Sequence, residues 1–273
     1  MAQVTFEERV QAVEALGLQP RQARFLVHVA LHSGYCLRRH YTDYTGTRKG
    51  KNTQHFFEDL VARGLATRLR FRADRGDIFH VHHPGLYRAL ALDHNRNQRH
   101  VSPALIARRL MLLDVVLSQP NVPWLATESD KVAIFTGEFH IALEDLPRRT
   151  LVARDAPPTT RYFLHKLPIA LVGTPPEPHF VHLATDTTVP AFIRFLREHA
   201  RLLSALPTWA VIVAHPRHVL GQSAWKAALI KLQLDTTSSL SPALSRDLER
   251  YFATRKAVER HQLAGLSVAD LQR

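Results

Sequence analysis

Residues 51–82, KNTQHFFEDLVARGLATRLRFRADRGDIFHVH, decide the fold of the first part of the chain. The first half of this stretch has apolar residues at helical spacing, which predicts an amphipathic helix. One side of that helix carries Phe56, Phe57, Leu60 and Val61. The other side carries the polar residues Thr53, Gln54, His55 and Glu58. Asn52 is the expected N-cap, and Gly64 is expected just past the last turn.

The second half of the stretch predicts a β-hairpin. Residues 68–72 alternate arginine with apolar residues, and period two is typical of a strand with two different faces. After the turn at residues 73–76, a second strand is expected at 78–82. The hairpin would present a row of arginines on one face.

Upstream of this stretch, apolar periodicity predicts three further helical segments, with ends marked by Gly17, Gly34 and Gly46. They cover residues 5–16, 20–34 and 37–44. Short helices followed by a two-stranded hairpin are the element order of a winged helix-turn-helix. In that fold the last helix enters the major groove of DNA and the hairpin lies against the backbone or the minor groove.

The residues expected to touch DNA fall on three surfaces of such a module: a basic loop, the start of the last helix and the wing. Lys and Arg neutralise phosphates, whereas Asn and Gln can bond adenine in bidentate fashion. The expected contact residues are Arg48, Lys49, Lys51, Asn52, Thr53, Gln54, His55, Arg68, Arg70, Arg72 and Arg75.

The charge balance agrees with a polyanionic partner. The 273 residues contain 36 Lys and Arg against 24 Asp and Glu, a formal net charge of +12. Residues 1–110 hold 18 of the basic residues and 9 of the acidic ones, so most of the excess lies in the predicted DNA-binding part. A basic surface that only keeps the protein soluble is the alternative interpretation.

A helix at 84–92 and a polar linker at 93–100 close the first domain, and an amphipathic helix is expected at 103–118. Beyond it the sequence predicts a small α/β domain. Its expected strands are 124–126, 132–135, 161–164, 169–172, 179–184 and 209–214, with a helix at 190–206 between the last two. Helices are also expected at 223–234 and 242–263. The fold class is therefore α+β, with a winged-helix domain at 1–100, an α/β domain at 101–241 and a C-terminal helix at 242–273.

Candidate catalytic and metal sites are incomplete. A metal-dependent nuclease needs an acid and an acid-x-Lys pair on neighbouring strands, but the chain has no Glu-x-Lys or Asp-x-Lys. Asp186 is the one well-placed acid, and a turn or N-cap role is favoured for it. His80, His82 and His83 lack partners for a zinc site and are interpreted as exposed wing residues. Cys36, the single cysteine, is expected to be buried. We expect no catalytic residues, metal or cofactor.

Residues 18–26 (LQPRQARFL), 60–65 (LVARGL) and 181–214 resemble the winged-helix proteins of bacterial mobile elements, including the replication-relaxation type. The resemblance is good over residues 18–92 and loose elsewhere. It implies a winged helix joined to a C-terminal domain similar to restriction-endonuclease folds. The missing acid-x-Lys pair separates this chain from an active nuclease.

The sequence therefore predicts a cytoplasmic, sequence-specific DNA-binding protein, a transcriptional or replication regulator of a plasmid, phage or integrated element. The single cysteine and the absence of a signal peptide or membrane span underlie the expected location. Its partner would be double-stranded DNA, and it would act as a homodimer if the apolar side of 242–263 pairs with a second copy. A nuclease or relaxation factor, and a structural subunit using the winged helix for protein contacts, are the alternatives.

Overall fold

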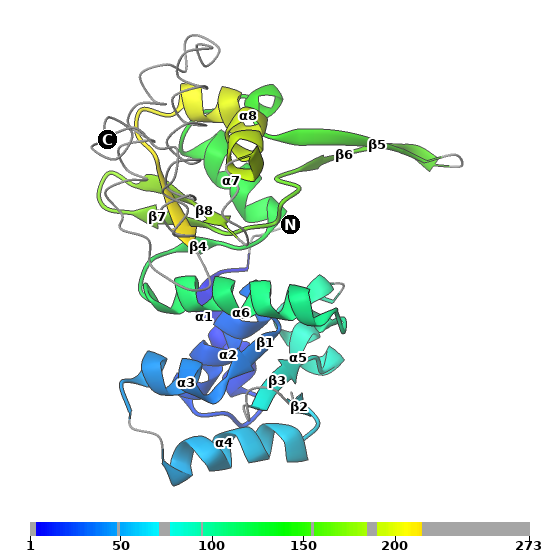
Figure 1. The fold of residues 1–273 in the computed structure, drawn as a ribbon, viewed down its shortest axis with the longest axis vertical. Coiled ribbons are helices and arrows are strands. Elements are labelled where there is room, and N and C mark those ends of the chain that lie inside the picture. Colours follow the sequence, from blue (N-terminus) through cyan, green and yellow to red (C-terminus); the bar gives the residue numbers. More distant parts are fainter. Residues whose placement is uncertain are drawn as a thin grey trace, which may run out of the picture.

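The computed structural model describes residues 4–47, 50–70, 77–93, 95–153, 156–184 and 190–214. Two lobes lie one above the other along the long axis, and helix α6 (Pro103–Leu117) lies between them (Figure 1). The described residues contain eight α-helices and three small sheets. The expected α+β class is confirmed at this level.

The first lobe contains five helices. α1 begins with a capping box in which the Thr5 and Glu8 side chains bond each other's backbone N–H. α2 begins at Pro20, whose fixed φ suits the first helical turn. Gly46, with φ of 65°, ends α3 in the left-handed conformation that glycine adopts without strain. The bounds are α1 Phe6–Glu14, α2 Pro20–His32, α3 Arg38–Thr45, α4 Lys51–Ala62 and α5 Pro84–Ala89.

The sheet of the first lobe has three antiparallel strands in the order β1-β3-β2. The two strands expected from the sequence are present as β2 (Ala66–Arg70) and β3 (Asp77–Val81). The third, β1 (Tyr35–Leu37), joins α2 to α3 and pairs with β3 from Tyr35 opposite His80 to Leu37 opposite Ile78. The sequence did not predict β1, because three residues are too few for an alternating pattern.

The core of this lobe forms where α2, α4 and β3 meet. Phe25, Phe57 and Phe79 are buried in it, and the rings of Phe57 and Phe79 lie 4.4 Å apart. Aromatic side chains bury large areas, so this contact sets the rotation of α4 about its own axis. It therefore determines which α4 residues face outward.

Part of the predicted linker at 93–100 is packed. The short helix η1 (Arg96–Gln98) lies against the end of α2, and Asn97 is buried. The Asn97 side-chain amide donates to the carbonyl oxygens of Ala30 and Leu31 at 2.9 and 3.1 Å. Those oxygens belong to the last turn of α2, where a helix leaves carbonyl groups unpaired, so Asn97 caps the helix. Gly34 is required beside it, because a Cβ there would collide with the Asn97 carbonyl.

The second lobe is built on a four-stranded sheet in the order β4-β7-β8-β9. β8 and β9 are parallel and are joined through α8, which confirms the expected strand-helix-strand unit. The other pairs in this sheet are antiparallel. The bounds are β4 Trp124–Leu125, α7 Glu128–Gly137, η2 Leu143–Asp145, β7 Ile169–Val172, β8 Glu177–Leu183, α8 Pro190–Ala205 and β9 Ala210–Ala214.

Two predictions for this lobe differ from the structure. The strand expected at 132–135 lies inside α7, where Thr127 and Asp130 form a capping box and Phe135 packs into the core. A short run of four apolar residues occurs in helices as well as in buried strands, so periodicity could not decide between them. The strand expected at 161–164 is also different in the structure. Its first two residues are the end of a longer strand, β6 (Ala156–Tyr162), and residues 163–164 are not in a strand. β6 pairs with β5 (Arg148–Ala153) in a separate hairpin.

Helix α6 contacts both lobes. Leu113 is buried in the core of the first lobe, whereas its neighbour Leu112 packs against Val181 and Leu183 of β8. Between Arg109 and Leu117 no residue of α6 is exposed. Arg39 of α3 also binds this helix, with two hydrogen bonds of 2.5 and 2.8 Å to the Asp114 carboxylate.

Among the residues that the structure describes, no helix combines the length and the apolar character needed to cross a membrane. The predicted helices at 223–234 and 242–263 lie outside the described residues.

Replacement of Leu113 by Ala should lower the free energy of unfolding by about 2–5 kcal/mol, because it removes buried methyl groups and leaves a cavity. Leu105→Ala on the same helix is the matched control, since Leu105 is 39% exposed. Denaturant titration of both variants measures the difference. Equal losses would mean that α6 does not pack as described.

The stability of the protein should also depend on pH through its buried histidines. Burial lowers the pKa of His28, His80 and His199 to about 4. For His199 the lowering by burial outweighs the hydrogen bond from its ring to the Phe195 carbonyl, which acts in the opposite direction. An unfolded chain holds the ordinary histidine pKa of about 6.5, so protons bind the unfolded state more readily. The stabilisation that comes from keeping these histidines neutral in the folded state is complete above about pH 7. It is lost as the pH falls from about 6.5 toward 4.

We therefore expect the free energy of unfolding to fall between about pH 7.5 and 5.5 by about 1 kcal/mol for each buried histidine. Denaturant titrations at the two pH values measure the change. His199→Gln should reduce the pH dependence, whereas His55→Gln should leave it unchanged, because the side chain of His55 is 76% exposed. A stability that is flat over this range would contradict the burial of these rings in neutral form.

Candidate nucleic-acid interface

The start of α4 presents an exposed polar surface that contains several of the predicted contact residues. Lys51, Asn52, Gln54 and His55 are all exposed. Gly50 precedes the helix in extended conformation, and within the described part of the chain no side chain caps the first turn. The unpaired backbone N–H groups of this turn, together with the helix dipole, favour an anion at this end. Lys51 adds a full positive charge to the same place.

Packing of the opposite side holds this turn in its orientation. Phe56 and Leu60 of α4 are buried, and the Phe56 ring lies 4.5 Å from that of Tyr41 on α3. Val61, which the sequence placed on the apolar side, is 37% exposed.

Two predicted residues of α4 have other roles. Thr53 is buried, with 6% of its surface exposed, because it lies one turn before Phe57 on the packed side of the helix. Thr53 lines part of the groove beside α4, but it offers little of its surface to a ligand. Asn52 is not the N-cap, since Gly50 occupies that position and α4 begins at Lys51. Asn52 is instead part of the exposed first turn.

The second turn of α4 is acidic. The Gln54 side-chain amide donates to the Glu58 carboxylate at 2.7 Å, and Nδ1 of His55 lies 3.9 Å from the same carboxylate. Asp59 pairs with Arg63 at 3.2 Å. A phosphate would be repelled by Glu58, so anion contacts are confined to the first turn. Glu58 also orients Gln54, which leaves the Gln54 carbonyl oxygen available as an acceptor.

An open groove of about 840 Å³ lies beside the first turn of α4. Its walls come from the start of α2, the end of α3 and the start of α4. The side chains of Gln19, Arg21, Thr45, Thr47, Lys51 and His55 line much of it. Gln19, Arg21, Thr45 and Thr47 were missed in the sequence because they are distant from α4 along the chain. Pro20 indicated in the sequence that a helix starts there, but it could not show that this helix start lies beside α4.

The arginines of the β2–β3 hairpin are partly neutralised. Arg68 and Arg70 are exposed, as expected for the predicted wing. Asp77, at the start of β3, lies 2.6 Å from Arg68 and 3.4 Å from Arg38 of α3. Arg70 has no ion pair with a carboxylate among the described residues. The predicted contacts Arg48, Lys49, Arg72 and Arg75 lie outside the described residues.

The histidines of this hairpin are not all exposed, contrary to expectation. His80 is buried, stacks on the Tyr35 ring at 4.2 Å and donates from Nε2 to the Asn97 carbonyl at 3.2 Å. His82 is half-buried, with Nε2 2.7 Å from the Thr67 hydroxyl. No group of three potential metal ligands occurs among the described residues. Cys36 is buried as expected, and burial raises the pKa of its thiol.

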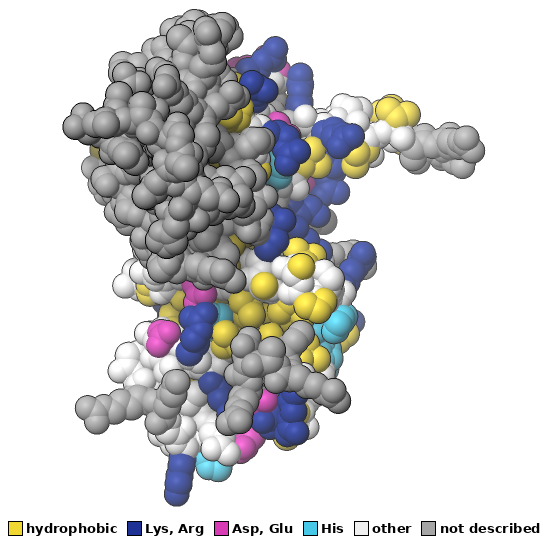
Figure 2. Space-filling view, in the orientation of Figure 1, with side chains coloured by type: hydrophobic (Ala, Val, Ile, Leu, Met, Phe, Trp, Pro, Cys, Tyr) yellow, Lys and Arg dark blue, Asp and Glu magenta, His cyan; other side chains and the backbone are white. Residues whose placement is uncertain are grey.

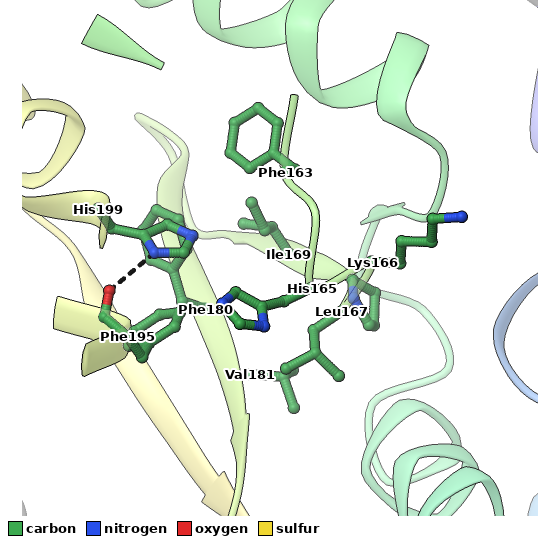
Figure 3. Close-up of a pocket in the computed structure, with 10 residues that line it drawn as sticks. Phe163, His165, Lys166, Leu167, Ile169, Phe180, Val181, Phe195 and His199 are labelled. Atoms are coloured by element: carbon green, nitrogen blue, oxygen red, sulfur yellow. Dashed lines mark hydrogen bonds between the residues drawn. The ribbon is translucent and has the colours of Figure 1, made fainter. Parts of the chain in front are cut away.

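The second lobe has a small internal pocket between α8, β7 and β8 (Figure 3). Its volume of about 20 Å³ suits about one water molecule and excludes a substrate. His199 donates from Nδ1 to the Phe195 carbonyl at 2.8 Å, and His165 contacts Glu198. These are structural contacts of a packed lobe. Asp186, the candidate nuclease ligand, lies outside the described residues.

Lys131 of α7 is the most buried cation described in this lobe. Its ammonium donates to the Leu167 carbonyl at 2.7 Å, and burial lowers its pKa to about 7. The Phe163 ring lies below it, with Nζ 5.5 Å from the ring centre. The carbonyl and the ring compensate for part of the lost hydration.

Comparison of the chain with protein-family models, with curated proteins and with solved structures finds no match.

Proposed function

We propose that the first lobe is a winged helix that binds double-stranded DNA with some sequence preference, and that the chain acts as a transcriptional or replication regulator of a mobile element. The observation that carries the proposal is the exposed, cationic first turn of α4, which lies outside the core and next to an open groove. The element order α2-β1-α3-α4-β2-β3 and the sheet order β1-β3-β2 support the winged helix.

In this proposal α4 enters the major groove by its N-terminal end. Lys51 and the backbone N–H groups of the first turn contact phosphate, because both are positive and exposed. Gln54 reads a base edge through its side-chain amide, with Glu58 holding its orientation. Glu58 and Asp59 would repel the DNA phosphates if the whole length of α4 lay in the groove. This repulsion favours a geometry in which only the first turn of α4 enters.

Arg70 contacts the DNA backbone from the wing. Arg68 makes a similar contact once its ion pair with Asp77 is broken. These contacts carry no sequence information, so they raise affinity for every duplex. The homodimer expected from 242–263 remains part of the proposal, since two winged helices would read a site with two half-sites.

The alternatives have less support. A nuclease needs convergent carboxylates, and the pocket described in the second lobe is too small for a substrate. The centre of a protein–protein interface is usually poor in Lys and Glu, whereas the outer surface of α4 carries Lys51 and Glu58.

The first test is a set of α4 variants in duplex-binding assays with and without Mg²⁺. Gln54→Ala should reduce discrimination between a preferred duplex and a random one by about 1–3 kcal/mol, because it removes a contact to a base edge. Thr53→Val is the matched control. It alters a buried residue of the same turn and should preserve the preference.

Lys51→Ala should weaken binding to preferred and random duplexes alike and reduce the salt dependence by about 0.9 in the slope of log K against log salt. Strand cleavage that depends on Mg²⁺ would favour the nuclease alternative. If none of these variants alters binding, α4 is not the DNA-reading helix.

A second test concerns Asp77, which pairs with both Arg68 and Arg38. Asp77→Asn removes the carboxylate that neutralises them, so affinity for any duplex should rise. The salt dependence should steepen by about 0.9 for each additional phosphate that these arginines neutralise. Asp93→Asn makes the same change in net charge at the ion pair with Arg88. Equal effects of the two variants would show that only the total charge matters.

A further inference from the structure

The β5–β6 hairpin projects sideways from the second lobe as an isolated two-stranded ribbon (Figure 1). Its strands pair only with each other among the described residues, from Arg148 opposite Tyr162 to Ala153 opposite Ala156. The side chains of residues 148–152 and 157–161 are exposed. A two-stranded ribbon without a packed face is marginally stable in water, so its extension away from the body calls for a contact.

The base of the ribbon is held firmly. Glu128, at the start of α7, accepts a hydrogen bond from the Tyr162 N–H at 2.7 Å and pairs with Arg161 at 2.7 Å. Just beyond the strand, Phe163 is buried and stacks on the Phe135 ring at 5.6 Å. The ribbon is therefore fixed in direction at its base while its outer part stands clear.

The ribbon carries a net positive charge, and two of its described arginines have no carboxylate partner among the described residues. Residues 148–162 contain four arginines and one acid, Asp155. Arg148 and Arg149 form no ion pair with a carboxylate among the described residues, and Arg149 lies directly opposite Arg161 across the ladder. Glu128 offsets the charge of Arg161, so the charge left for an anionic partner is that of Arg148 and Arg149. Figure 2 shows dark-blue side chains on this projection and yellow ones farther out.

The outer part of the ribbon disfavours another β-strand as its partner. Pro157 and Pro158 cannot donate ladder hydrogen bonds, and the register shifts between Leu151 and Ala153. Proline, charge and bulges are the features that protect sheet edges from pairing with other chains. The partner is therefore one that the ribbon meets through its side chains.

We propose that the β5–β6 hairpin is a second DNA-binding element, an arm that lies in a groove of the duplex. A two-stranded ribbon fits the major groove in width, and its arginines are placed for the phosphates on either side. The aliphatic Leu151 and Val152, 47% and 79% exposed, lie beyond the arginines and contact the sugars and bases. The choice of DNA as the partner rests on the proposed function, but the residues involved are separate from α4 and the wing.

The test compares hairpin variants of the full chain on random-sequence duplexes of about 15 and about 40 base pairs. Arg148→Ser with Arg149→Ser should weaken binding to the longer duplex by about 30-fold at about 0.15 M salt. It should also reduce the salt slope by about 1.8, the amount for two phosphates that are no longer neutralised. Arg148→Lys with Arg149→Lys keeps both charges and should restore most of the binding. Thermal unfolding of each variant checks that the fold is intact.

The matched control is Arg88→Ser with Arg108→Ser, which removes two exposed arginines from α5 and α6. If this control loses as much affinity as the hairpin variant, net charge alone is responsible and the arm is refuted. The arm is also refuted if the hairpin variant binds DNA as the unaltered protein does. If the variant changes only the oligomeric state measured by sedimentation, the partner of the hairpin is a second copy of the chain.

Failure of this proposal can be told apart from failure of the first. If Lys51→Ala and Gln54→Ala impair DNA binding while the hairpin variant does not, the winged-helix proposal is supported and the proposed DNA-binding arm is refuted. If the hairpin variant impairs binding while the α4 variants do not, the reverse holds.

Discussion

Helix α6 is the element on which the arrangement of the two lobes depends. From Arg109 to Leu117 its residues are buried or half-buried, with Leu113 in one core and Leu112 in contact with β8 of the other lobe. A helix that is apolar on more than one side is stable only when each side is covered, so neither lobe can be removed without exposing part of α6. The pair between Arg39 and Asp114 adds a directional contact to this packing.

Carboxylates control the arginine-rich surfaces of the molecule. Asp77 holds Arg68 at the hairpin of the first lobe, and Glu128 holds Arg161 at the base of the β5–β6 ribbon. In both places one arginine is restrained while others, Arg70 and Arg149, remain exposed. Each carboxylate offsets part of the charge of the arginine that it contacts, so both surfaces have a lower positive potential than their arginine content alone would give.

Much of the first lobe was predictable because its signals are local. The helix-end signals Thr5, Pro20 and Gly46 and the alternation in β2 each act within a few residues, so helix and strand positions follow from them. The errors occurred where the pattern was short or shared. β1 has only three residues, and the run at 132–135 fits a helix as well as a strand.

The candidate site was predictable only in part. The polar first turn of α4 could be recognised from residue type, but the burial of Thr53 follows from how the Phe57 and Phe79 rings meet. The ion pair between Arg68 and Asp77 could not be foreseen, since it depends on the register that places Asp77, at the start of β3, beside β2. The β5–β6 ribbon was missed because prolines and polar residues weaken its strand pattern.

The sequence by itself determined the helices with clear caps and periodicity, the basic character of the first lobe and the parallel pair β8–β9 around α8, because these depend on neighbouring residues and on charge. Only the tertiary structure decided that Thr53 of α4 is buried, that Asn97 closes the end of α2, that α6 joins two cores and that the β5–β6 ribbon stands clear of the body. These features arise from contacts between residues far apart in the chain, and local patterns carry no record of such contacts.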